Sequence, residues 1–149
     1  MLERENIIAD LLSRLRGIEG VAIVTRNWRK HSQLKALPAI FVRDRGDEVI
    51  EDSGRPTPNM KRDWTISLVT ILAGTTEETA PAELANFQKL VRAAVYQDAK
   101  RLIGTDETRA KIVEDQCSGI VFPDMGNNTV AQEIEYHVIY VEDVAKLFE

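Results

Sequence analysis

Two long segments of alternating hydrophobic residues most constrain how this chain can fold. Residues 60–72 place tryptophan, isoleucine and leucine at alternate positions and then become apolar on both faces. Residues 130–141 repeat the alternation, with mostly apolar side chains at even positions and Glu133, Glu135 and His137 opposite them. A period of two predicts β-strands, and strands with one apolar face need a second layer to cover that face.

Two segments with a helical period can supply that layer. Residues 2–16 carry isoleucine and leucine on one helical face and charged residues on the other. A second helix is predicted from Pro81 to about Ile103, with Thr79 as its N-cap and Gly104 as its stop. Its apolar face is broad, so we expect it to cover one face of the sheet.

Shorter apolar runs predict three further strands, at residues 21–25, 38–43 and 111–122. Residues 44–62 are charged and contain glycine and proline, so they predict a polar tip on a long hairpin. We expect residues 45–62 to be poorly ordered in a free subunit and to become ordered on assembly. The element order predicts an α+β fold in one domain over residues 1–149. Its sheet should be mostly antiparallel with about four to five strands, helices packed on it and a long β-hairpin arm.

The composition narrows the class of protein. A length of 149 residues suffices for one domain with its own core. The only cysteine, Cys117, cannot form an internal disulfide or a Cys-rich zinc site, which favours a reducing, intracellular setting. No segment approaches the roughly 20 apolar residues that cross a membrane, and the N-terminus lacks the apolar core of a signal peptide. The formal net charge of −5 disfavours a general nucleic-acid binder.

The residue patterns predict no catalytic, cofactor-binding or metal site. His137 could pair with Glu133 or Glu135 as an acid–base site, but a polar strand face or a subunit contact is the simpler interpretation. His31 is far from His137 in the sequence, and the two give no metal-binding spacing. Cys117 lies in a predicted strand, where cysteine is usually a small core residue. We therefore expect a protein without enzymatic activity, cofactor or metal.

Charged residues in two connections are the predicted contacts with partners. A basic run after the first short strand contains Trp28, which could stack on a nucleic-acid base. The simpler interpretation of this run is a solvated loop, or a patch that meets an acidic surface on a neighbour. The hairpin tip has mixed charge and is either a solvated loop or an arm that orders on a partner. The predicted contact residues are Arg29, Lys30, Arg45, Asp47, Glu48, Glu51, Asp52 and Arg55.

The order of these elements resembles a known family, the tail terminators and tail-completion proteins of long-tailed bacteriophages (the minor-tail-protein-U type). The resemblance is a pattern of elements over nearly the whole chain and includes no signature motif. The segments that carry it are the helix 6–15, the strands 21–25 and 37–42, the strand 64–72, the helix 84–102 and the closing strand 133–140.

The resemblance implies a structural function. Such proteins form a ring, commonly a hexamer, that caps the tail tube, ends tube polymerisation and joins the tail to the head or neck. The implied partners are other copies of the chain, the tail-tube protein and a head or neck connector protein. DNA would be only the passing genome, and no membrane would be involved. The implied location is the virion tail, after assembly in the host cell cytoplasm.

Three other functions remain open at this point. A head-completion or neck connector subunit would also form oligomers but would bind the portal side. A small binding module would need a ligand pocket, and an enzyme would need a second titratable group beside His137. The acidic net charge adds a hypothesis for the ring, because an acidic lumen would repel DNA phosphates and let the genome slide past.

Overall fold

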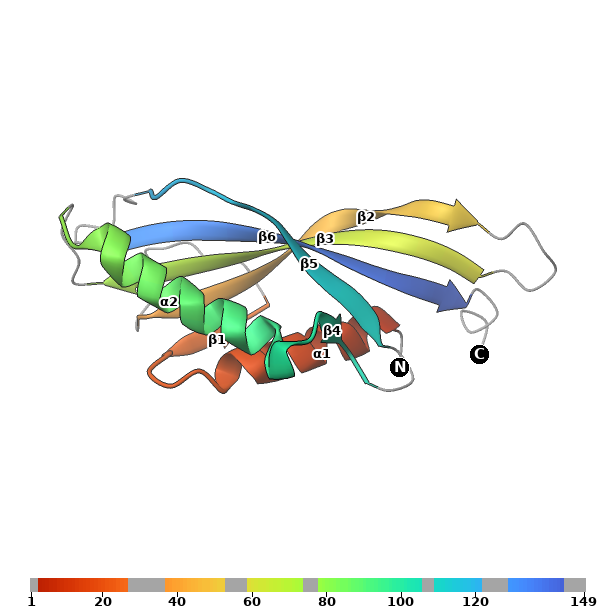
Figure 1. The fold of residues 1–149 in the computed structure, drawn as a ribbon, viewed down its shortest axis with the longest axis horizontal. Coiled ribbons are helices and arrows are strands. Elements are labelled where there is room, and N and C mark those ends of the chain that lie inside the picture. Colours follow the sequence, from red (N-terminus) through yellow and green to blue (C-terminus); the bar gives the residue numbers. More distant parts are fainter. Residues whose placement is uncertain are drawn as a thin grey trace.

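The computed structural model describes residues 3–26, 37–52, 59–73, 78–105, 109–121 and 129–143. In these residues, a twisted six-stranded sheet carries two α-helices on one face (Figure 1). Helices and strands that share one core in this way fit the predicted α+β class. In chain order the elements are α1 (Glu3–Arg16), β1 (Ile23–Thr25), β2 (Ala39–Asp52), β3 (Asn59–Ala73), α2 (Ala80–Val95), the 3₁₀ turn η2 (Gln97–Ala99), β4 (Leu102–Ile103), β5 (Ala110–Cys117) and β6 (Thr129–Asp143).

The sheet is mixed, with the strand order β1-β2-β3-β6-β5-β4. β1 runs parallel to β2, whereas every other pair of neighbouring strands in this order is antiparallel. The sequence predicted four to five mostly antiparallel strands, whereas the sheet has six strands and is mixed because β1 is parallel to β2. The missed strand is β4, which has two residues and is too short to show an alternation of its own.

α2 ends at Val95 and not near Ile103 as predicted. Tyr96 leaves the helical region with φ −95° and ψ 49°. At this end, Arg14 of α1 donates hydrogen bonds to the carbonyl oxygens of Val95 and Leu102 at 2.8 and 2.9 Å. A donor from another helix thus satisfies a terminal carbonyl that α2 itself leaves unpaired.

The main core lies between the helices and one face of the sheet, and the alternation in β6 decides which side chains join it. Ile134, Tyr136 and Val138 are fully buried in this core, as the period of two predicts. A second, smaller cluster explains why the end of β3 is apolar on both faces. It lies on the face of the sheet away from the helices and consists of Ala39, Phe41, Val69, Ile71 and Ala131.

The segment 44–62, predicted as a polar loop, is largely strand in its described part. β2 continues through Asp52 and β3 begins at Asn59, and the two strands pair along this whole length. Charged residues and a glycine are depleted in strands, which is why the sequence pattern favoured a loop. Residues 53–58 lie outside the described structure, as do the predicted turn 123–128 and the C-terminal residues from 144 onward. In the part of the chain described, no helix has the length and apolar character needed to cross a membrane.

Candidate functional site

Three strands form an arm that extends past both helices (Figure 1). The arm consists of residues 44–52 of β2, 59–66 of β3 and 136–143 of β6, and neighbouring strands in it are antiparallel. β3 lies in the middle because it pairs with β2 on one side and with β6 on the other. The arm is therefore a three-stranded extension of the sheet, wider than the two-stranded hairpin that the sequence predicted.

A bulge in β2 puts two carboxylates on the same side of the arm. The register with β3 passes from Asp44 opposite Ile66 to Asp47 opposite Trp64, so β2 carries an extra residue here. Gly46 lies in this bulge with φ 94°, a backbone region that glycine enters without strain. In a regular strand, side chains three positions apart would point to opposite faces. With the extra residue, Asp44 and Asp47 both point towards the helix side.

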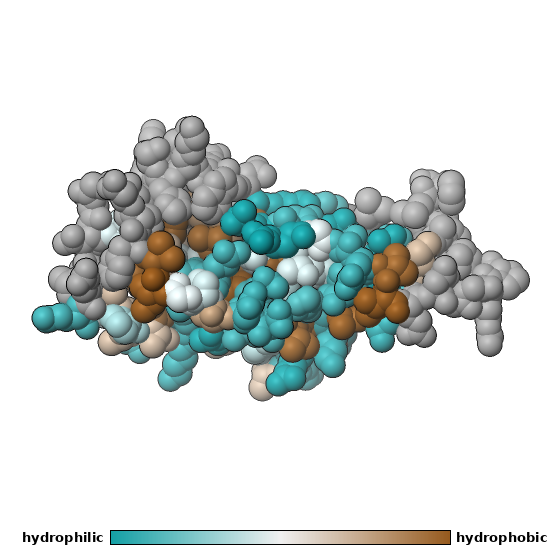
Figure 2. All heavy atoms as spheres, turned by 90° about the horizontal axis from the view of Figure 1, so that it is seen from above, coloured by the Kyte–Doolittle hydropathy of each residue, from teal (hydrophilic) through white to brown (hydrophobic). Residues whose placement is uncertain are grey.

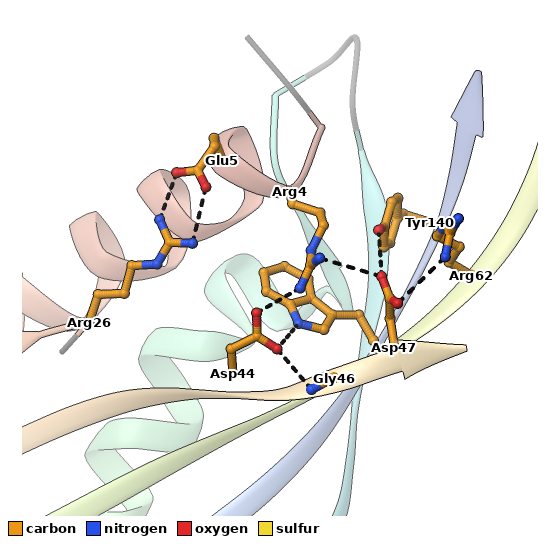
Figure 3. A network of polar contacts seen from close by, with 9 residues as sticks. Arg4, Glu5, Arg26, Asp44, Gly46, Asp47, Arg62 and Tyr140 are labelled. Carbon is orange, nitrogen blue, oxygen red and sulfur yellow. Dashed lines mark hydrogen bonds and ion pairs between the residues drawn. The ribbon is translucent and has the colours of Figure 1, made fainter. Parts of the chain in front are cut away.

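Trp64 is the central side chain at the base of the arm and is completely buried. Its Nε1–H donates to Oδ1 of Asp44 at 2.9 Å, and the guanidinium of Arg4 lies 4.4 Å from the centroid of its ring. Arg4 also lies 2.7 Å from Asp44 and 3.5 Å from Asp47 (Figure 3). The first turn of α1 is therefore attached to the base of the arm by a cation–π contact with Trp64 and by ion pairs with Asp44 and Asp47.

The same network continues into β3 and β6. Arg62 of β3 lies 3.1 Å from Glu142 and 3.5 Å from Asp47. Tyr140 of β6 donates to Asp47 at 3.4 Å, and its ring packs edge-to-face on Trp64 with 6.3 Å between centroids. Burial is the main cause that raises the pKa of Tyr140 to about 12, so its hydroxyl remains a donor at neutral pH. All three strands of the arm thus meet in one set of contacts.

Asp44 keeps its negative charge although it is partly buried. Burial is the largest effect and raises its pKa, but the Nε1–H of Trp64, the backbone N–H of Gly46 and the charge of Arg4 together lower it below its ordinary value. The hydrogen bond from Gly46 N to Asp44 Oδ1 measures 2.8 Å. The carboxylate is therefore the acceptor that joins the bulge, the tryptophan and α1.

We expect Gly46→Ala to lower the free energy of unfolding by about 1–2 kcal/mol, because other residues enter the left-handed region only with strain. A Cβ at this position would meet no atom within 4 Å, so the effect would come from the backbone and not from a clash. Gly119→Ala is the matched control, since it also has open space but no positive φ. Urea unfolding measures both variants, and an equal stability of the two would contradict the prediction.

The contact residues predicted from the sequence fall into three groups. Asp47 forms ion pairs with Arg4 and Arg62 at the base of the arm, so its charge serves contacts within the chain more than contacts with a partner. Arg45 and Glu48 are exposed, and Arg45 lies 3.9 Å from Glu133. The remaining predicted contacts lie outside the described structure, namely the side chains of Glu51 and Asp52 and the residues Arg29, Lys30 and Arg55.

Arg26, which opens the basic run, is bound within the chain. Its guanidinium donates two hydrogen bonds to the carboxylate of Glu5 on α1, at 2.7 and 3.0 Å. The hydrogen bond from Arg26 is also the main cause that lowers the pKa of Glu5. This cation therefore serves the attachment of α1, and the rest of the run, residues 27–35, lies outside the described structure.

Sequence reasoning missed that Arg4, Asp44 and Trp64 belong to one site. One signal was present, because an isolated glycine inside a strand pattern indicates a bulge, and Gly46 stands between two aspartates. A bulge at that position would have placed Asp44 and Asp47 on the same face. No comparable signal places Arg4 beside them, since its hydrogen bond to Asp44 joins residues 40 positions apart.

On the other face of the arm, His137 is surrounded by carboxylates. Its Nδ1 lies 2.7 Å from Asp63 of β3, and its Nε2 lies 3.2 Å from Asp115 of β5 and 3.8 Å from Glu135. The hydrogen bond to Asp63 is the main cause that raises the pKa of His137, and burial opposes it. Of the two glutamates predicted beside this histidine, Glu135 is near it, whereas Glu133 lies near Arg45.

This geometry suits a proton better than a metal ion. The ligand atoms of Asp115, Glu135 and His137 lie within 4.8 Å of one another. A metal ion, however, needs a neutral imidazole, whereas carboxylates at both ring nitrogens favour the doubly protonated form.

Burial is the main cause that raises the pKa of the Cys117 thiol, which leaves the thiol in its less nucleophilic, protonated form at neutral pH.

We expect the His137 cluster to stabilise the fold at low pH more than at high pH. Because the folded-state pKa is raised, its contribution is complete below the unfolded pKa of about 6.5 and is lost as pH rises through the folded pKa. The side chain is 31% exposed, so screening keeps the difference below about 1 kcal/mol. Urea unfolding between about pH 5.5 and pH 9 should show this decline in the natural chain but not in His137→Gln. The same decline in both proteins would contradict it.

A groove of about 510 Å³ lies between α1 and α2 and is the candidate site for a small ligand. Asp10, Arg14 and Leu90 contribute to its lining. Two of its polar side chains are used within the chain: Arg14 donates to the carbonyl oxygens of Val95 and Leu102, and Asp10 accepts a hydrogen bond from Gly104 N at 2.7 Å. These contacts attach α1 to the end of α2 and to the segment around β4.

Comparison with known proteins identifies no family for this chain. No family model matches the chain, and no curated protein matches it. Among solved structures, the chain is similar to one from the virion of a native gene transfer agent (GTA) particle, with 15% sequence identity and a TM-score of 0.42. The alignment covers 95% of this chain and 92% of that chain. A similarity at this level carries no argument about function, which must come from the residues themselves.

Proposed function

We propose that the chain is a structural, non-catalytic subunit of a phage-like virion, and specifically a tail terminator. In this role, copies of the chain form a ring, commonly a hexamer, on the end of the tail tube. The ring stops the addition of tube subunits and offers a surface to the head or neck connector. The genome passes through the ring, and the protein is part of the virion tail after assembly in the host cytoplasm.

The observation that carries this proposal is the firmly attached arm. It projects past the helices, yet buried Trp64 and the ion pairs of Arg4 fasten it to the body of the domain. Three exposed aliphatic side chains lie on it, Val49, Ile50 and Val141. Exposed apolar side chains on projecting strand edges are typical of surfaces that associate with a partner.

The element order gives further support. In chain order the structure has an amphipathic helix, a long strand pair with a polar excursion, a covering helix and a closing strand. This is the order of elements on which the resemblance to tail terminators rests. The described residues offer little for catalysis, because His137 is enclosed by carboxylates and the Cys117 thiol is held protonated. A role in assembly uses the arm, whereas an enzymatic role would leave it unexplained.

The test is the mass of the protein in solution by light scattering, alone and with tail-tube protein from the same genome. A ring-sized particle that forms by itself or on tube ends, and that blocks further tube growth, is the expected result. A ring that ignores tube ends would overturn the terminator role in favour of a head-completion or neck connector. A monomer that ignores tube protein at high concentration would overturn the structural role altogether.

A further inference from the structure

The arm has two open edges. Among the described residues, β1 pairs with β2 only at residues 39–41, and β5 pairs with β6 only as far as Ile139. The outer edge of β2 from residue 42 to 52 and the edge of β6 from residue 140 to 143 therefore have no neighbouring strand in the described structure. Strand edges with unpaired backbone groups are natural sites of association between chains.

The edge on β2 is acidic and apolar. Residues 47–52 read Asp-Glu-Val-Ile-Glu-Asp, with no basic residue among them. Val49 and Ile50 are 46% and 45% exposed, and Glu48 is exposed beside them. Hydrophobic side chains are visible at the arm end of the molecule (Figure 2). We call Glu48, Val49 and Ile50 the acidic edge.

The edge on β6 is basic and apolar. A groove of about 360 Å³ opens beside the last residues of β6, and three basic side chains line it together with one acidic one, Glu3. The strand register puts Lys61 opposite Val141 and Lys111 opposite Ile139, so the two lysines flank an aliphatic pair. Val141 is 56% exposed. We call Lys61, Arg109, Lys111, Ile139 and Val141 the basic groove.

The two surfaces are complementary in charge, and each presents aliphatic side chains, which are exposed at Val49, Ile50 and Val141 and half-buried at Ile139. A chain with a net charge of −5 repels its own copies at long range, so association needs a local attraction of this kind. Register shifts between Asp44 and Asp47 and between Val49 and Glu51 interrupt the outer edge of β2. These bulges prevent a long backbone ladder with a partner, so the contact must be made chiefly by side chains.

We propose that the acidic edge of one copy binds the basic groove of a second copy. This inference rests on the proposed assembly of the chain and names the surfaces that would build it. The two surfaces lie on opposite edges of the same arm, so each copy can bind one neighbour on each side. Such a head-to-tail contact uses the same pair of patches in every copy and closes into a ring when its rotation divides a full turn.

Two substitutions test the contact through charge. Ile50→Lys puts a positive charge on the acidic edge, where it would face the basic groove of the neighbour. Val141→Asp puts a negative charge in the groove, where it would face the acidic edge. The matched controls are Leu90→Lys on α2 and Val121→Asp, because Leu90 is 50% exposed and Val121 is 56% exposed. Circular dichroism checks that all four variants are folded.

Light scattering then measures assembly, alone or on tube ends. Each single variant should need at least about tenfold more protein to assemble than the natural chain, while the two controls assemble normally. Mixing Ile50→Lys with Val141→Asp should restore assembly, since the new lysine of one chain would face the new aspartate of the other. Normal assembly of the single variants, or no rescue on mixing, overturns the contact but leaves the ring. A natural chain that never assembles overturns both proposals.

Discussion

Trp64→Ala should lower the free energy of unfolding by about 3–5 kcal/mol, the largest effect that we expect from a single substitution in this chain. Trp64 is fully buried, so its removal leaves a cavity where the arm joins the core. The change also deletes the Nε1–H donor to Asp44, the ring under Arg4 and the edge-to-face contact with Tyr140. Urea unfolding followed by circular dichroism measures this loss.

Trp64→Phe separates the packing of this side chain from its hydrogen bond. Phenylalanine keeps an aromatic ring beside Tyr140 but has no donor for Asp44, so we expect a smaller loss of about 1–3 kcal/mol. A loss below about 1 kcal/mol for Trp64→Ala would show that the arm base is not part of the cooperative core. The arm would then be attached by surface ion pairs alone, which rarely contribute more than about 1 kcal/mol each.

The parts of the fold that the sequence predicted are those with a long repeat. α1 and β6 have many turns or alternations, so their buried faces could be assigned from the spacing of isoleucine, leucine and tyrosine. The strand β4 and the end of α2 could not be assigned in this way. β4 has two residues, and the end of α2 depends on Arg14, which reaches Val95 from 81 positions away.

The strand at residues 44–52 of the arm was also not predictable from local sequence alone. Local composition argued against strands in residues 44–52, because charges and glycine fit a loop. The strand forms there because tertiary contacts override that preference. Trp64 and Arg4 bind Asp44, and the bulge at Gly46 aligns it with Asp47. The histidine cluster was found only in part, since Asp63 and Asp115 reach His137 from other strands.

Asp44→Ala should lower the free energy of unfolding by about 2–3 kcal/mol, because it leaves a buried donor without an acceptor. That donor is Trp64 Nε1–H, and the backbone N–H of Gly46 loses the same partner. Asp44→Asn is the matched control, since its amide oxygen can still accept from Trp64 while the charge that faces Arg4 is gone. We expect the asparagine variant to lose about 1 kcal/mol or less, as for other exposed ion pairs.

The same residue should make the chain sensitive to acid. The pKa of Asp44 is lowered in the folded state, so its contribution is complete above the unfolded pKa of about 3.9 and is lost as pH falls through the folded value. Unfolding measured at falling pH should therefore bring the natural chain closer in stability to Asp44→Asn. A gap between the two that is constant down to low pH would show that the charge of Asp44 does not stabilise the arm. Equal losses for the alanine and asparagine variants would instead assign the whole effect to the ion pair with Arg4.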